Sequence, residues 1–105
     1  MAIERQPCTY MLASQPRGTI YVGATSNLVA RMHQHRTRAF AGFTSRYRVY
    51  CLVRFEMAET KEQAILREKQ LKRWHRPWKI NLIESDNPHW SDLAVDLGFD
   101  PLPPR

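Results

Sequence analysis

Two short runs of aromatic and β-branched residues lie close together near the start of the chain, and they limit its possible fold more than any other feature. The runs cover residues 8–13 and 19–22, and the segment between them, residues 14–18, is rich in turn-forming residues. This pattern predicts a β-hairpin. Because a hairpin joins antiparallel strands, we expect the chain to contain an antiparallel sheet.

Two amphipathic helices are predicted downstream of the hairpin. The first covers residues 28–36 and follows a segment of helix-capping residues, 25–27. The second opens at a capping box that begins with Thr60. It is expected to run to about Trp74, because Pro77 would block a longer helix.

Three further segments complete the sequence-based assignment. Residues 47–56 are expected to form a third strand whose side chains alternate between two faces, with one face carrying Val49, Cys51, Val53 and Phe55 and the other carrying Tyr50, Leu52 and Arg54. Residues 79–83 are expected to be a strand or an extended piece. Asn87 and Pro88 are expected to start a last short helix that ends near Gly98.

The order of these elements indicates the fold class. A chain of 105 residues is long enough for one compact domain. We expect an α+β fold in which helices flank a small central three-stranded antiparallel sheet, in the order ββαβα with a short C-terminal helix. Residues 39–46 are expected to form a loop, residues 1–98 a single domain, and residues 99–105 a proline-rich tail.

The net charge of +6 is unevenly distributed along the chain. Residues 1–83 hold 15 of the 16 Lys and Arg residues but only five of the ten Asp and Glu residues. Such a surplus favours polyanions, chiefly nucleic acid or an anionic membrane surface. No stretch approaches the roughly 20 apolar residues that span a bilayer, and the first residues lack the apolar core of a secretion signal. We therefore expect a cytoplasmic protein that does not enter membranes.

The cysteines and tryptophans are expected to be structural. Cys8 and Cys51 lie in apolar strand-like runs and form no CxxC pair, so they are predicted to be buried free thiols. Trp74, Trp78 and Trp90 are expected to be core or lid residues rather than platforms for stacked bases.

Glu68 is the most informative single position in the chain. It lies on or beside the apolar stripe of the second helix, with Ala64 one turn before it and Leu71 one turn after it. A carboxylate in such a place needs a partner. Helix geometry alone favours a surface ion pair, with Lys72 the first candidate, and the functional alternative is a metal ligand at the edge of the core.

Other residues in the chain have side chains suited to phosphate chemistry. Arg31 and His35 are one helical turn apart, which suits recognition or protonation of a phosphate, although a basic helix face is the simpler interpretation. Tyr10 and Tyr21 lie in the two hairpin strands, where packing is the default role of tyrosine. The sequence contains no zinc-site spacing, nucleotide-binding glycine loop or serine-hydrolase motif.

Taken in order, these residues form a pattern that resembles the GIY-YIG nuclease superfamily, in particular its small stand-alone bacterial members. Thr9-Tyr10-Met11 keeps the tyrosine of the first half of the signature, and Tyr21-Val22-Gly23 closely matches the second half. The likeness covers nearly the whole chain, and the segments that carry it further are Ala24 to Leu28, Arg31, His35, Gly42 to Tyr47, Arg67 to Lys72, Trp74 to Lys79, and Asn87 to Trp90.

The resemblance implies an endonuclease that depends on a divalent metal ion and hydrolyses phosphodiester bonds. The catalytic residues it implies are Glu68 as the ligand of one Mg²⁺ or Mn²⁺ ion, Arg31 on the scissile phosphate, Tyr10 and Tyr21 around the attacking water, His35 beside the arginine, and Asn81 as a supporting asparagine. Either Tyr21 or His35 could act as the base. The residues expected to bind nucleic acid are Arg36, Arg38, Arg46, Lys72 and Arg73.

The same resemblance leaves the substrate open. DNA is the expected substrate, cut with structure selectivity or weak specificity, and a repair or recombination role is consistent with this. Relatives often carry a lysine where this chain has Ala24, and many obtain their specificity from a separate DNA-binding domain. A protein partner could supply that specificity here. The alternatives are an RNA nuclease and a nucleic-acid-binding module of the same fold that does not cut.

Overall fold

The computed structural model describes residues 6–37 and 47–102 of the chain. Its elements, in chain order, are β1 (Cys8–Ala13), β2 (Ile20–Thr25), α1 (Leu28–Arg36), β3 (Cys51–Met57), α3 (Lys61–Arg73), α4 (Arg76–Asp86) and the 3-10 helix η2 (Leu93–Leu97).

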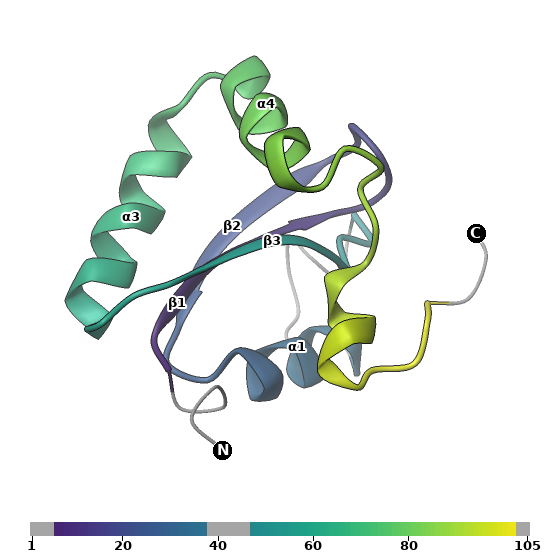
Figure 1. Cartoon of the computed structure of the whole chain (residues 1–105), viewed down its shortest axis with the longest axis horizontal. Helices are drawn as coiled ribbons and strands as arrows, with labels where there is room; N and C mark the ends of the chain where they lie inside the picture. The colour runs from purple at the N-terminus through teal and green to yellow at the C-terminus, as the bar shows by residue number, and fades with distance from the viewer. Residues whose placement is uncertain (1–5, 38–46, 103–105) are drawn as a thin grey trace.

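The three strands form one antiparallel sheet in the order β2-β1-β3. All six residues of the central strand β1 are buried, because helices cover both faces of the sheet. Figure 1 shows α1 and η2 on one face and α3 and α4 on the other. The α+β fold and the three-stranded antiparallel sheet flanked by helices are therefore confirmed.

A separate hydrophobic core fills the space on each face of the sheet. The core under α1 and η2 consists of Cys8, Tyr10, Leu12, Leu28, Met32, Val49, Leu52 and Ala94. The core under α3 and α4 consists of Met11, Ala13, Val22, Val53, Leu71, Ile83 and Trp90. Alternate residues of β1 thus contribute to opposite cores, as the two-residue period of a strand requires.

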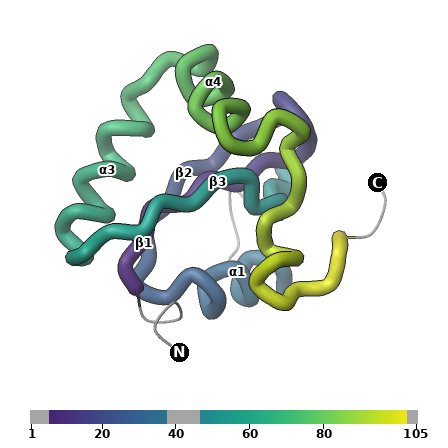
Figure 2. Tube along the Cα trace, viewed as in Figure 1, coloured from purple at the N-terminus to yellow at the C-terminus, as the bar shows by residue number. Residues whose placement is uncertain are grey.

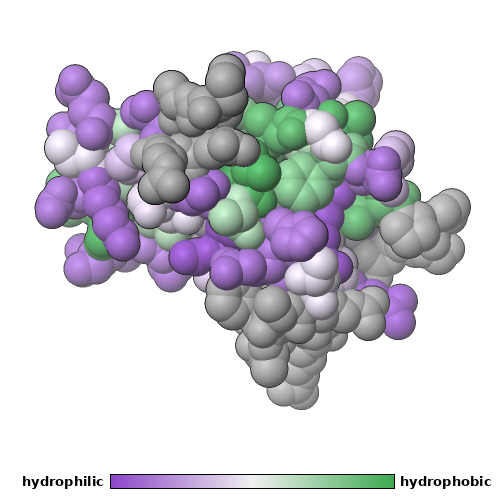
Figure 3. Space-filling model, turned by 90° about the horizontal axis from the view of Figure 1, so that it is seen from below, coloured by the Kyte–Doolittle hydropathy of each residue, from purple (hydrophilic) through white to green (hydrophobic). Residues whose placement is uncertain are grey.

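The face formed by α1 and η2 carries a gathering of hydrophobic side chains at its surface (Figure 3). Val95 in η2 is 42% exposed, and Phe99 is partly buried against the core beneath.

On the opposite face of the sheet, the turn of the hairpin lies beside α4 (Figure 2), where the Arg17 guanidinium donates two hydrogen bonds to Glu84. Trp90 donates a third to the same carboxylate, at 2.7 Å.

The local capping signals predicted α1 and α3. Asn27 caps α1, because its side chain accepts a hydrogen bond from the Ala30 amide. Thr60 caps α3 in the same way through the Gln63 amide. Both cysteines are free, as predicted, but only Cys8 is buried, since Cys51 is partly exposed. Burial raises the pKa of the Cys8 thiol to about 12.

The segment 79–83 is helical, so its assignment as a strand or extended piece was wrong. It lies inside α4, which begins at Arg76, with Pro77 in its first turn. Proline is favoured there because the first amides of a helix need no partner within it. α3 already ends at Arg73, and Pro77 lies in the first turn of the next helix. Asn87 follows the end of α4, and the last helix begins only at Leu93.

A bulge in β3 overturns the predicted alternation of that strand. The pairing with β1 shifts between Met11 and Leu12, which lie opposite Arg54 and Leu52, so Val53 is the extra residue. Val53 and Cys51 pack in the core under α3 and α4, whereas Phe55 packs in the core under α1.

The bounds of two strands also differ from the prediction. β3 begins at Cys51 rather than at residue 47, and β2 continues through Gly23 to Thr25. The predicted loop at residues 39–46 falls outside the residues that the structure describes.

Across the described part of the chain, none of the helices has the length and apolar character needed to cross a membrane.

The ion pair between Arg36 and Asp92 yields a prediction about stability. Its side chains are only 11% and 15% exposed, and Asp92 also accepts hydrogen bonds from the amides of Leu52 and Ala94. Asp92→Ala would leave a buried guanidinium without its counter-charge, so we expect the free energy of unfolding to fall by about 3–5 kcal/mol. Urea denaturation measures the change. Asp96→Ala, at an exposed position in η2, is the matched control and is expected to change it by less than about 0.5 kcal/mol.

Candidate functional site

A buried hydrogen bond joins the two central side chains of the candidate site. The Tyr10 hydroxyl lies 3.0 Å from Nε2 of His35. Tyr10 is fully buried and His35 is 4% exposed. The Tyr21 ring packs against both, with ring centroids 6.2 Å from Tyr10 and 5.8 Å from His35. The structure therefore brings together three residues that the sequence placed on three separate elements.

The hairpin register explains why the two tyrosines meet. Tyr10 pairs with Gly23 and Tyr21 pairs with Leu12, so the tyrosines are diagonal neighbours on one face of the sheet. The Tyr10 ring crosses the backbone of β2 at Gly23. A Cβ at that position would lie 2.5 Å from the ring and from the hydroxyl. Because the glycine of the Tyr21-Val22-Gly23 motif has no side chain, the Tyr10 ring can occupy the space beside it.

The helix α1 brings His35 and Arg31 to the tyrosines. It begins three residues after β2, and Leu28 and Met32 hold it in the core, with exposures of 0%. His35 lies on the same side, one turn beyond Arg31. Arg31 is half-buried and its charge acts on both Tyr10 and His35.

Burial sets the protonation states of this cluster at neutral pH. Burial, with a smaller contribution from the Arg31 charge, lowers the pKa of His35 to about 4. Burial also raises the pKa of Tyr10, helped by Tyr21 and opposed by Arg31. At pH 7 the imidazole is therefore neutral and Tyr10 is a phenol. A neutral imidazole has one acceptor nitrogen, which suits a hydrogen bond to the Tyr10 hydroxyl.

Glu68 lies on the other side of the sheet, in α3, together with Ala64 and Leu71 on the inward side of the helix. Its side chain is 19% exposed, and Oε2 accepts a hydrogen bond from Nζ of Lys72 at 2.8 Å. The structure thus contains the ion pair that helix geometry favours. α3 packs against β2, one of the two edge strands of the sheet, from the face opposite the tyrosine cluster.

Thr9 links the strand of the tyrosines to the helix of Glu68. Its hydroxyl donates a 2.8 Å hydrogen bond to the Ala64 carbonyl oxygen, one turn before Glu68. Aligned on Tyr10 as the last residue of the first half of the signature, that half is Cys8-Thr9-Tyr10 rather than Thr9-Tyr10-Met11. A side chain with a hydroxyl at its middle position is a feature that we did not single out from the sequence.

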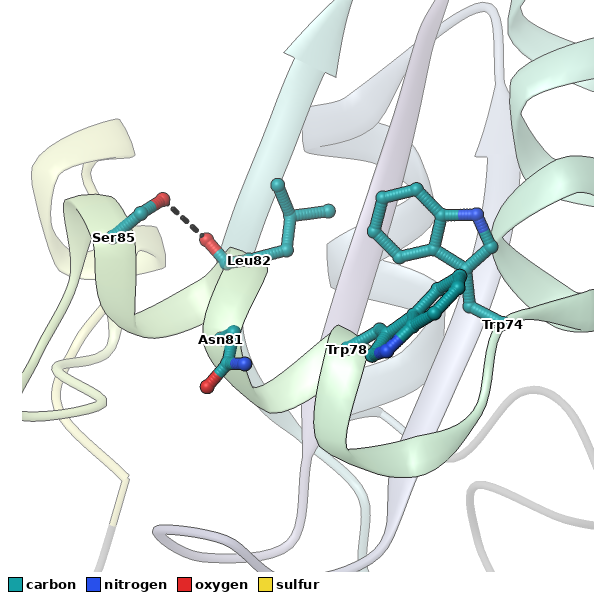
Figure 4. Close-up of a pocket in the computed structure, with 5 residues that line it drawn as sticks. All are labelled: Trp74, Trp78, Asn81, Leu82 and Ser85. Atoms are coloured by element: carbon teal, nitrogen blue, oxygen red, sulfur yellow. Dashed lines mark hydrogen bonds between the residues drawn. The ribbon is translucent and has the colours of Figure 1, made fainter.

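Asn81 is placed apart from the tyrosine cluster. It lies exposed on the outer side of α4, beside Trp78 and at the rim of a hollow that Trp74 also lines (Figure 4). Asn87, by contrast, is 7% exposed, and its amide nitrogen donates hydrogen bonds to the carbonyl oxygens of Val53 and Ser91. Asn87 therefore holds the turn after α4 in place.

The residues predicted to bind nucleic acid have different surroundings. The Arg36 guanidinium is bound to Asp92 and to the Tyr50 and Asp100 carbonyl oxygens, and it stacks on Phe99, so it is part of the fold. Lys72 is half-exposed and paired with Glu68, and Arg73 is exposed. Arg38 and Arg46 lie outside the residues that the structure describes.

The donor set limits which metal ion could bind. Within residues 6–37 and 47–102, no group of three or more His, Cys, Asp or Glu side chains is arranged to hold a metal. Zinc takes three or four protein ligands, whereas magnesium keeps several waters and is often held by one or two carboxylates. The half-buried carboxylate of Glu68 therefore fits magnesium or manganese better than zinc.

Sequence comparisons find a matching family model and several relatives. A model of the GIY-YIG catalytic domain matches residues 6–81, a range that holds every residue predicted here to be catalytic. A UPF0213 protein of Staphylococcus aureus is 36% identical over 67 residues, which cover 64% of this chain and 82% of that protein. A UPF0213 protein of Staphylococcus haemolyticus is 35% identical over 66 residues, which cover 63% and 80%. No solved structure shows a significant match.

The contact between Tyr10 and Gly23 yields a test of the packing. Gly23→Ala would place a methyl group 2.5 Å from the Tyr10 ring, so the ring or the strand must move. We expect a loss of about 1–3 kcal/mol in the free energy of unfolding, which is typical of overpacking. A double-mutant cycle with Tyr10→Leu checks the cause. The cost of Gly23→Ala should shrink in the Tyr10→Leu background, and an unchanged cost would refute the proposed clash.

The buried His35 makes stability depend on pH. Its folded pKa of about 4 lies below the ordinary 6.5, so the unfolded chain binds one more proton between these values. We therefore expect the free energy of unfolding to fall by up to about 1.4 kcal/mol per pH unit as the pH drops from 6.5 to 4. Urea titrations at several pH values measure this slope. His35→Gln should flatten it, while His33→Gln, at an exposed position of the same helix, should leave it unchanged.

Proposed function

The chain belongs to the GIY-YIG catalytic domain family, and from this premise we propose that it is a divalent-metal-dependent endonuclease that hydrolyses phosphodiester bonds in DNA. The family supports nuclease activity in general. The observation that carries the proposal for this chain is the contact of Tyr10, Tyr21 and His35 with Arg31 beside them. These groups come from β1, β2 and α1, so a rigid sheet and a capped helix fix their positions.

Arg31 is the group proposed to hold the scissile phosphate. A guanidinium presents several N–H donors to phosphate oxygens and always carries its charge. In-line attack increases the negative charge on those oxygens, so a fixed cation beside them lowers the barrier. Arg31 is only half-buried, which leaves part of its side chain accessible to a substrate.

The two tyrosines are proposed to have different roles. Tyr10 is fully buried and bonded to His35, so its role is to hold the imidazole and to support the ring of Tyr21. Tyr21 is half-buried, so its side chain can contact the attacking water. We therefore assign the orientation of that water to Tyr21, with His35 kept neutral behind it by burial.

Glu68 is the residue proposed to hold the metal ion. A divalent cation bound there would neutralise charge on the phosphoryl oxygens. The ion pair with Lys72 holds the rotamer of the carboxylate in place in the absence of that cation.

A second candidate function is a module that binds nucleic acid without cutting it. It is favoured by the ion pair itself, because Lys72 occupies an oxygen of the carboxylate that the enzyme would need. An RNA nuclease is a further alternative, since the phosphate chemistry of the site does not discriminate against a 2′-hydroxyl. A role in repair or recombination, with a partner protein supplying specificity, remains part of the proposal for the enzyme.

Glu68→Gln separates the enzyme from the binding module. We expect magnesium-dependent cleavage to fall by roughly 100-fold or more, the scale seen when one group that stabilises transition-state charge is lost, while binding stays within a few-fold of the parent. The assay uses labelled duplex, branched, single-stranded and RNA substrates, so it also identifies the preferred structure.

Lys72→Met is the matched control for that experiment. It breaks the same ion pair but leaves the carboxylate, so if Glu68 acts as a ligand, cleavage should fall no further than nucleic-acid binding does, since Lys72 is itself predicted to contact nucleic acid. Equal loss of cleavage in both variants with binding unchanged would mean that the ion pair serves the fold, and the metal-site assignment would be wrong. Binding without cleavage by the parent protein on every substrate would establish the non-catalytic module instead.

A further inference from the structure

A large aromatic side chain is exposed where α3 meets α4. Trp78 is 56% exposed, although the sequence predicted a core or lid residue. Trp90 is 5% exposed and Trp74 is partly buried against the core under α3 and α4, so these two tryptophans pack in the core as predicted. The Trp74 ring stands edge-on to the Trp78 ring, with centroids 5.9 Å apart and planes at 84° (Figure 4). The two indoles thus form an L-shaped aromatic surface that opens to solvent.

A hollow of about 350 Å³ lies against this aromatic surface. Besides the two indoles, its lining consists of Leu82 and the polar side chains of Asn81 and Ser85. Figure 4 shows these three residues along α4, next to Trp78, and Leu82 also packs against the core under α3 and α4. An apolar wall with an amide and a hydroxyl at its rim matches a nucleobase, which has two apolar faces and a polar edge.

A second hollow lies on the other side of Trp74, along the outer side of α3. It is lined by Leu66, Lys69, Gln70, Arg73 and Trp74 itself. Leu66 is 70% exposed, and the two lining cations are exposed as well. Trp74 therefore separates two adjacent hollows, one neutral and one cationic, on a continuous outer surface.

The charge around the two hollows favours a polyanion. Residues 66–82 contain six Lys and Arg residues and a single acidic residue, Glu68. Glu68 is paired with Lys72, and Arg67 is paired with Glu56 of β3 while stacking on Trp74 at 5.3 Å. A pair of aromatic rings inside a cationic surface is the combination that binds unpaired nucleotides, with stacking on the rings and phosphates on the cations.

We propose that the indole of Trp78, together with Trp74, forms a stacking site for a base of an unpaired nucleic-acid segment, with Lys69 and Arg73 placed to contact its phosphates. The site rests on the proposed nucleic-acid substrate and deepens it, because it selects substrates that carry unpaired nucleotides. It is separate from Glu68, which faces the sheet side of α3 whereas Leu66, Gln70 and Arg73 face outward.

Trp78→Ala tests the proposal, and because Trp78 is 56% exposed we expect the variant to keep the fold. The full chain is titrated with a labelled single-stranded oligonucleotide, with a duplex that carries a single-stranded tail, and with the same duplex blunt-ended. We expect binding of the first two to weaken by about 5- to 100-fold, which corresponds to the loss of one stacked base. Binding of the blunt duplex should change by less than about twofold.

Two variants make the result specific. Trp78→Phe keeps an aromatic face and should retain most of the binding, because stacking tolerates a smaller ring. Val95→Ala, at another exposed apolar position on the opposite face of the sheet, should bind like the parent. In the parent, the tailed duplex should quench tryptophan emission, and Trp78→Phe should remove most of that quenching.

The outcomes separate this proposal from the proposed function. Equal binding of the single strand by Trp78→Ala and the parent would overturn the stacking site, even if the parent cuts DNA. Trp78-dependent binding without any cleavage would support the stacking site and count against the enzyme. A parent that binds none of the three oligonucleotides would also overturn it, and the aromatic surface would then suit a protein partner.

Discussion

The close approach of the Tyr10 ring to the backbone of Gly23 is the contact on which the rest of the candidate active site depends. Because position 23 has no side chain, the ring can cross β2 and its hydroxyl can reach His35. α1 follows β2 after a two-residue cap, so the hairpin that sets this contact also sets where α1 lies. Apart from Glu68, the residues proposed to act in the site thus lie within one short stretch of chain and are positioned by local pairing.

Local signals in the sequence were enough to predict the hairpin, the helices α1 and α3, and the caps of these helices. Thr60 and Asn27 act on amides only three residues away, so their effect can be recognised without the fold. The bulge at Val53 and the helix α4 were missed for a different reason. A bulge depends on how β3 meets β1, and the role of Pro77 depends on whether the chain has room to start a new helix at Arg76.

The basic residues show where charge counting stops being informative. Arg36 and Arg73 contribute equally to the surplus of +6, yet Arg36 is bound to Asp92 and two carbonyl oxygens whereas Arg73 faces solvent at the edge of a hollow. Nothing in the sequence around Arg36 indicates that Asp92, 56 residues away, will be its partner. The tyrosines and His35 could be selected from the motif, but their mutual contacts depend on register and burial, which sequence alone leaves open.

The ion pair between Glu68 and Lys72 affects how α3 on one face of the sheet and Arg31 on the other could bind one substrate. Lys72 is 51% exposed, and an exposed pair one helical turn apart contributes only about 0.3–0.5 kcal/mol. A divalent cation interacts with a carboxylate more strongly than one ammonium group does, so Lys72 would be displaced at little cost and could turn toward a phosphate. Arg31 on one face and Lys72 on the other would then bracket the edge of β2 with positive charge. The hydrogen bond from the Thr9 hydroxyl to the Ala64 carbonyl oxygen joins the turn of α3 that precedes Glu68 to the strand that carries Tyr10. This bond would help to hold Glu68 and Tyr10 in fixed relative positions.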